Sequence, residues 1–85
     1  MPEIARFLGI LIKMFCVQIE HRQPHFFALY GGEYMGIFDI KTLEMLQGDL
    51  PPRLVALVRE WAELHQKELL EMFASGKTYN LPPLE

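Results

Sequence analysis

Two histidines lie four positions apart in this sequence and are the first candidates for chemistry. His21 and His25 flank a short polar segment that contains Pro24, and Glu20 directly precedes the first of them. A metal site needs three or four converging ligands, and imidazole and carboxylate groups are suitable. The competing interpretation is a loop histidine in solvent and a strand histidine hydrogen-bonded to the backbone. His21 and His25 are therefore candidate metal ligands and candidate catalytic residues.

A second candidate site lies in the segment 60–65, which reads Glu-Trp-Ala-Glu-Leu-His. Glu60 and Glu63 are three residues apart, so they lie near one another on a helix surface. Carboxylates close to His65 could serve in acid–base catalysis. Alternation of glutamate with core residues is, however, also what an amphipathic helix shows. Trp61 is better explained as an anchor between helix and sheet.

The remaining signatures of catalysis are absent from the sequence. Gly31 and Gly32 belong to no phosphate-binding loop. Ser75 is the only serine and has no base near it in the sequence. Cys16 lies in an apolar run, without the cationic setting that activates a thiolate. No cofactor is expected.

Composition limits the class of protein. A chain of 85 residues has room for one domain, 1–85, and 51% hydrophobic residues supply a core. The net charge of −3 argues against direct binding of nucleic acid, which needs clustered lysine and arginine. A single cysteine excludes an internal disulfide, and Lys13 interrupts the short apolar stretch 7–17. A cytoplasmic protein that does not enter the membrane is expected.

The strands are predicted by apolar runs between turn residues. The run 10–17 predicts a buried strand, and Gly31-Gly32 predicts a two-residue hairpin turn between 26–30 and 33–40. A short further strand is expected near 43–47. The hairpin register that follows pairs Tyr30 with Glu33, Ala28 with Met35 and Phe26 with Ile37, and it places Phe27 over Gly36.

One long helix is predicted over about 52–75. Pro51 and Pro52 suit its first turn, and Ser75-Gly76 suits its end. Apolar residues recur in it at spacings of three and four: Leu54, Leu57, Val58, Trp61, Leu64, Leu69, Met72 and Phe73. The extended tail 77–85 is expected to lie over the domain or on a neighbour. The fold class is thus α+β, an antiparallel sheet of three to four strands (about 7–47) packed against one long C-terminal helix.

Several short motifs together resemble one family. They are the opening Met-Pro-Glu-Ile-Ala-Arg-Phe-Leu-Gly-Ile, Gln23-Pro24-His25-Phe26, Tyr30-Gly31-Gly32, Gly48-Asp49-Leu50-Pro51 and the segment 60–66. The chain resembles, over essentially its whole length, the bacterial family of short proteins known as domain of unknown function 4160. The resemblance implies no defined activity. It implies a gene layout like that of toxin–antitoxin pairs, with a second small protein encoded alongside.

The chain departs from the family pattern at one informative position. The resemblance implies Pro-His-Phe-His, with two histidines on the same strand face, but Phe27 occupies the second position here. Three explanations stay open: the histidine cluster was never functional, this member has lost the function, or another side chain substitutes. The packing role predicted for Phe27 fits the first.

Two hypotheses for function follow. The first is a protein–protein interaction module that binds the product of the adjacent gene or associates with itself, since the chain is apolar and a sheet edge invites pairing. The alternative is a small toxin-like enzyme, a ribonuclease or metal-dependent hydrolase, that uses His25, His21 and a helix carboxylate. A nucleic-acid-binding regulator would need a basic stripe that the sequence lacks.

Overall fold

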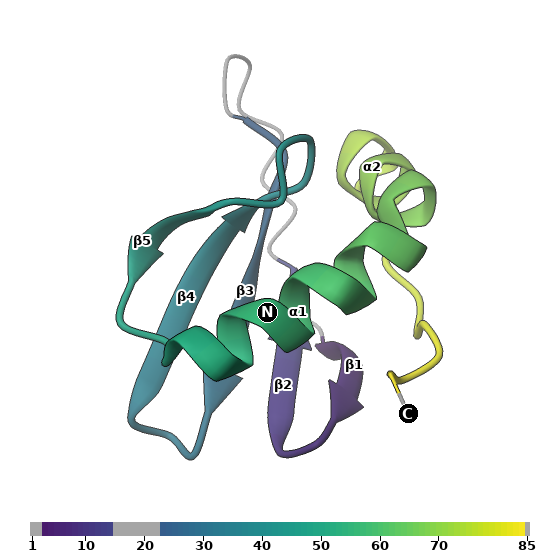
Figure 1. Ribbon diagram of the computed structural model, residues 1–85. Helices are drawn as coiled ribbons and strands as arrows, with labels where there is room; N and C mark the ends of the chain where they lie inside the picture. Colours follow the sequence, from purple (N-terminus) through teal and green to yellow (C-terminus); the bar gives the residue numbers. More distant parts are fainter. Residues whose placement is uncertain (1–2, 15–22, 85) are drawn as a thin grey trace.

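The computed structural model describes residues 3–14 and 23–84 and forms an α+β fold (Figure 1). Its antiparallel sheet has five strands in the order β1-β2-β3-β4-β5, so each strand lies beside its neighbour in the sequence. The elements are β1 (Glu3–Phe7), β2 (Ile10–Lys13), β3 (His25–Tyr30), β4 (Tyr34–Asp39), β5 (Met45–Gly48), α1 (Pro52–Leu64) and α2 (Gln66–Ser75). The predicted α+β class is confirmed. The sheet has five strands where three to four were predicted, and two helices replace the predicted single long helix.

The first strand, β1, was not predicted. It pairs with β2 through a tight turn at Leu8 and Gly9. A register shift between Glu3 and Ala5 leaves both Ile4 and Ala5 buried, so this strand lacks the alternation by which strands are recognised. The strand predicted over 10–17 is present as Ile10–Lys13; Met14 follows it outside the strand, and 15–17 lie outside the described residues.

The hairpin between β3 and β4 is where it was predicted, but its register is different. Tyr30 pairs with Tyr34 around a three-residue loop, in which Gly31 and Gly32 have φ of 63° and 73°. The slip by one residue turns every side chain of β4 to the other face. It brings Phe38 opposite Phe26, with the two buried rings stacked at 5.3 Å. Burial of this pair explains why the longer loop is preferred.

The predicted cover of Gly36 by Phe27 is therefore wrong. Gly36 pairs with Ala28, on the core face. A Cβ at Gly36 would lie 2.9 Å from the Met45 sulfur and 2.9 Å from a ring carbon of Phe38. The side chains of Met45 and Phe38 thus occupy the space next to Gly36 on the core face. Phe27 pairs with Ile37 on the opposite side of the sheet.

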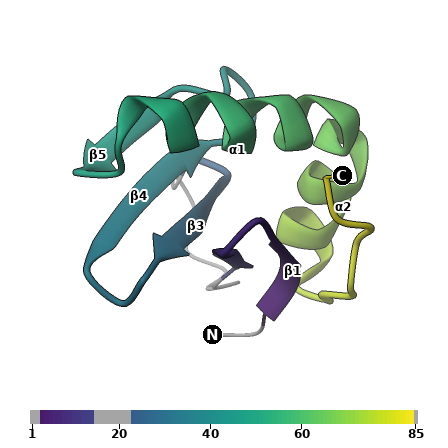
Figure 2. The same ribbon diagram turned by 60° about the horizontal axis from the view of Figure 1, so that its bottom comes forward.

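The long helix is broken at His65. This residue has φ −120° and ψ 19°, and α2 leaves in a new direction (Figures 1 and 2). α1 lies across one face of the sheet and buries Leu54, Val58, Trp61 and Ala62, whereas α2 packs beside the sheet and buries Leu69 and Met72. The Gln66 amide donates to the carbonyl oxygens of Ile40 (2.8 Å) and Lys41 (3.0 Å), which holds the start of α2 against the loop after β4. No glycine or proline marks this break in the sequence.

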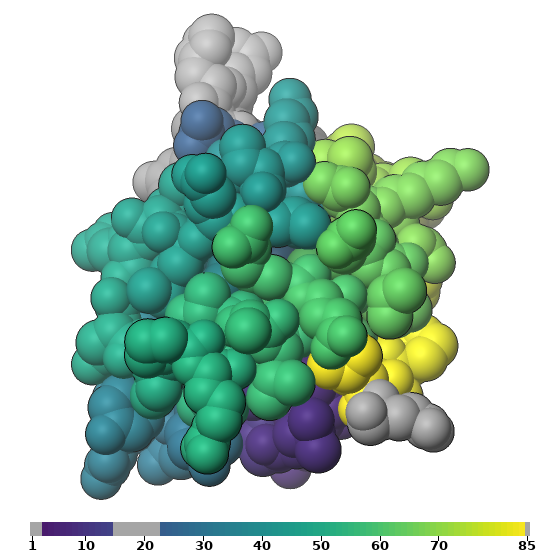
Figure 3. All heavy atoms as spheres, in the orientation of Figure 1, coloured from purple at the N-terminus to yellow at the C-terminus, as the bar shows by residue number. Residues whose placement is uncertain are grey.

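The C-terminal tail lies back over the domain, beside β1 (Figures 1 and 3). The Leu81 N–H donates to the Ile4 carbonyl oxygen (2.7 Å), and the indole N–H of Trp61 donates to the Pro82 carbonyl oxygen (2.8 Å). Leu81 is buried against the core. Of the two alternatives for the tail, the structure shows the first.

The turn after β4 depends on Asp39, the one buried charged residue among those described. Its carboxylate accepts hydrogen bonds from the backbone N–H groups of Lys41 (2.7 Å) and Thr42 (3.1 Å). An Asp39→Ala variant should lose about 1–3 kcal/mol of unfolding free energy in urea, because two backbone N–H groups lose a charged acceptor. Asp39→Asn keeps an acceptor oxygen and should lose less; equal losses would contradict this role.

Candidate functional site

One side of the sheet is covered by α1, and the other side is the candidate interaction surface (Figure 2). Directly paired residues share a face, and two cross-strand rows lie on the side away from α1. One row runs through Leu11, Leu29 and Met35, and the other through Lys13, Phe27 and Ile37. We refer to these six residues as the open face.

The open face is apolar and accessible. Five of its six side chains are apolar, Met35 is 39% exposed, and the others are partly exposed. The buried apolar side chains of the same strands, such as Ile12, Ala28 and Phe38, point to the α1 side. In the part of the chain that the structure describes, no helix covers this face. A contiguous apolar surface of this kind marks a binding site more often than isolated apolar residues do.

Two hollows lie on this side of the sheet. One, of about 320 Å³, is lined by Arg6, Gly9, Leu11, Leu29, Gly31 and Gly32. The other, of about 250 Å³, is lined by Gln23, His25, Phe27, Ile37, Leu46 and Gln47. They lie at opposite ends of the apolar rows, so the surface offers recesses for side chains of a partner.

Three charged residues, Glu3, Arg6 and Lys13, lie at the β1–β2 end of the open-face side. The Arg6 guanidinium donates to both carboxylate oxygens of Glu3 (3.0 and 3.3 Å), and this carboxylate raises the pKa of Arg6. Lys13 is the register partner of Glu3, but no ion pair joins Lys13 to any described residue. The surface is therefore apolar in its middle, and at this end it carries one lysine, Lys13, that has no ion-pair partner among the described residues.

His25 lies at the start of β3, where its Nδ1–H donates to the carbonyl oxygen of Gln23 (2.8 Å). Its ring contacts two aromatic rings, Phe27 at 5.6 Å and Phe73 at 5.5 Å between centroids. Asp39 is its register partner, yet the Asp39 carboxylate is used by the turn, and no described side chain hydrogen-bonds to His25. This arrangement is typical of a structural histidine at the rim of the open face.

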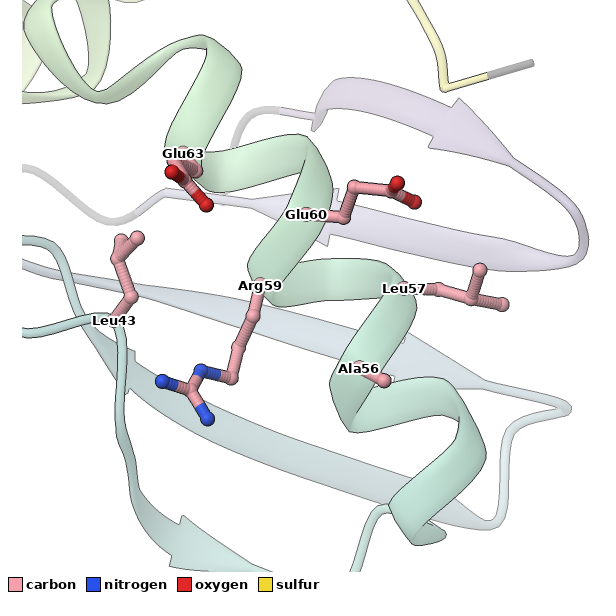
Figure 4. Close-up of a pocket in the computed structure, with 6 residues that line it drawn as sticks. All are labelled: Leu43, Ala56, Leu57, Arg59, Glu60 and Glu63. Carbon is pink, nitrogen blue, oxygen red and sulfur yellow. The ribbon is translucent and has the colours of Figure 1, made fainter.

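Glu60 and Glu63 lie on the outer side of α1, away from His25. They line a shallow hollow of about 460 Å³ together with Leu43, Ala56, Leu57 and Arg59. Figure 4 shows that the side chains of Glu60 and Glu63 lie on different sides of the helix. The two glutamates thus do not converge on one point.

His65 does not join these glutamates. Its ring packs on Trp61 at 5.3 Å, and its Nδ1 is 3.9 Å from a Glu68 carboxylate oxygen, too far for a hydrogen bond. Nδ1 is buried without a hydrogen-bond partner among the described residues. His25, Glu60 and His65 therefore lie in three separate surroundings.

His21, Glu20 and Cys16 lie outside the described residues. Within residues 3–14 and 23–84, no three histidine, cysteine, aspartate or glutamate side chains come together as a metal site would require. None of the described helices is both long enough and apolar enough to cross a membrane.

Sequence reasoning did not single out the open face. The predicted register placed Phe27 opposite Gly36 and put Met35 and Ile37 on the other face, which would have left this surface interrupted. The available signal was that Phe26, Ala28 and Phe38 could all be buried on one face. A two-residue loop puts Phe38 on the opposite face from Phe26, so burial of all three requires a three-residue loop.

Comparison with known proteins gives a family but no activity. No curated protein and no solved structure matches the chain. The model of a family described as "Domain of unknown function (DUF4160)" matches residues 9–74, which span β2 to α2 and include all six residues of the open face and all of α1. The resemblance noted in the sequence motifs is thereby confirmed, and the chain belongs to this family.

Proposed function

We propose that this protein is an interaction module whose open face binds another protein. The observation that carries the proposal is the pair of apolar rows on the side of the sheet away from α1, which no described element covers. Removal of partly exposed leucine, isoleucine and phenylalanine side chains from water favours association. Among the described residues no acid–base groups converge on this surface, which favours binding over catalysis.

The proposed partner is a second protein, the product of an adjacent gene in a toxin–antitoxin-like pair, or a second copy of this chain. The family resemblance supports the gene pair. Lys13 lies at one end of the open face and has no ion-pair partner among the described residues, which favours a partner with a carboxylate at the corresponding place.

The test uses a double substitution in the middle of the open face. Leu29 and Met35 are register partners, so Leu29→Lys with Met35→Glu introduces opposite charges that can still pair across the strands. Tagged wild-type protein, recovered gently from its own cells, should carry a stoichiometric protein or elute as an oligomer by light scattering. The double variant should be recovered without that partner, or the dissociation constant of its oligomer should be at least tenfold higher.

A matched control is available on α1. Leu64 is 67% exposed and lies away from the open face, so Leu64→Glu should keep the partner. Circular dichroism checks that both variants fold. A monomeric wild-type protein without a bound protein, or a folded double variant that keeps its partner, would contradict the proposal.

A further inference from the structure

The two edges of the sheet are treated differently by the chain. On β1, the tail covers the outer edge: the Leu81 N–H donates to Ile4, and Trp61 holds the next residue, Pro82. β5 is the last strand at the other edge and pairs with β4 alone. Among the described residues, no backbone hydrogen bond reaches the outer side of β5. Alternate N–H and C=O groups of β5 therefore point outward without a partner in the described chain.

The residues of β5 do little to prevent pairing. The strand reads Met-Leu-Gln-Gly, with neither the charge nor the proline by which edges are usually protected. Leu46 is 49% exposed. The strand is short, and a bulge falls at Leu46, because Gln47 pairs with Ile37 and Met45 with Phe38. These two features limit what can pair here to a short segment.

Space for side chains exists on both sides of this edge. Side chains of an added strand alternate between the two faces of a sheet. On the open-face side, the hollow of about 250 Å³ is lined by Phe27, Ile37 and Leu46. On the α1 side, the hollow of about 460 Å³ lies between Leu43, which leads into β5, and the polar residues Arg59 and Glu63 of α1 (Figure 4).

We propose that the edge of β5 binds an extended peptide segment of a partner protein, which adds a sixth strand to the sheet. Main-chain hydrogen bonds to β5 give affinity in this mode, and pockets for alternate side chains give specificity. The chemistry of the two hollows sets the pattern of the peptide: apolar residues face Phe27, Ile37 and Leu46, and the polar residues between them face Arg59 and Glu63.

A second copy of the chain fits this edge less well. A strand of four residues is about 13 Å long, so two copies paired along this edge share only a small contact area. A stable dimer interface buries about 800 Å² on each partner. A flexible peptide can follow the bulge and fill both hollows, which two rigid sheets that meet edge to edge cannot. The backbone edge of β5 is separate from Leu29 and Met35 in the middle of the open face, although the hollow for apolar side chains shares Phe27 and Ile37 with that face. This inference rests on the edge of β5, so it does not depend on the proposed function.

The experiment pans a phage-displayed library of random dodecapeptides on the intact protein and measures the enriched peptides in solution. The enriched sequences should alternate apolar and polar residues, and their binding should shift the amide NMR signals of residues 45–48. Leu46→Lys should weaken binding at least tenfold, because a lysine on an edge opposes strand pairing. Leu64→Lys makes the same change on an exposed leucine of α1 and should leave Kd unchanged.

Other outcomes would overturn the inference. They are a library without enriched peptides, enriched peptides that bind Leu46→Lys as well as the wild type, or peptides that shift only signals of residues 11 and 29. Concentration-dependent dimers that Leu46→Lys abolishes would show that a second copy occupies the edge instead. The Leu29→Lys/Met35→Glu variant should keep peptide binding, so a failure of this inference is distinguishable from a failure of the proposed function.

Discussion

A Trp61→Ala variant is expected to lose about 3–5 kcal/mol of unfolding free energy, the range for removal of a large buried aromatic side chain. Trp61 is fully buried, and its ring stacks on Phe7 at 5.6 Å and meets Phe26 edge-on at 6.1 Å. Its indole N–H also holds the tail through Pro82. A domain of this size has roughly 4–13 kcal/mol of stability in total, so the variant should be partly unfolded at 37 °C.

Urea unfolding followed by circular dichroism measures this loss, because the variant has no tryptophan fluorescence. Trp61→Phe separates the two roles of the side chain: it keeps an aromatic ring in the core and removes the hydrogen bond to Pro82. Faster amide exchange at Leu81 in Trp61→Phe would report release of the tail. A loss below about 1 kcal/mol in Trp61→Ala would show that the core is not built around this residue.

A Gly48→Ala variant is expected to lose about 3 kcal/mol or more, because the backbone here has no room for a side chain. Gly48 has φ of 126°, which non-glycine residues rarely adopt. An added Cβ would lie 2.2 Å from the Met35 carbonyl oxygen and 2.8 Å from the Gly36 Cα. Both are backbone atoms of β4, so relief requires β5 to move away from the sheet.

Gly32→Ala is the matched control for this prediction. Gly32 also has positive φ, 73°, but no atom lies within 4 Å of an added Cβ. It should lose only about 1–2 kcal/mol, the penalty of the left-handed conformation alone. The difference between the two variants in urea unfolding measures the close approach of β5 to β4. Equal losses would contradict that approach.

The sequence by itself determined the types of element and most of their positions. Gly31 and Gly32 between apolar runs predicted the β3–β4 hairpin, and the apolar residues of 52–75 predicted a helical region. The family was also readable from short motifs, and the family match over 9–74 agrees. These signals are local, since turn residues and apolar periodicity act within a few positions of the chain.

Only the tertiary structure decided the register, the helix break and the position of the tail. Two-residue and three-residue loops both accept Gly31-Gly32, and stacking of Phe38 on Phe26 selects the second. The break at His65 follows from burial of Leu69 and Met72 beside the sheet, since no local residue type requires it. The tail is placed by hydrogen bonds to Ile4 and from Trp61, residues far from it in the sequence.

The same distinction explains why the candidate surfaces could not be predicted. A one-residue slip exchanges the two faces of β4, so membership of Met35 and Ile37 in the open face depends entirely on the register. The free edge of β5 likewise depends on which strands end up at the rim, and the bound tail decides that β1 is covered. Local sequence specifies the strands, whereas long-range packing specifies which of their faces and edges remain for a partner.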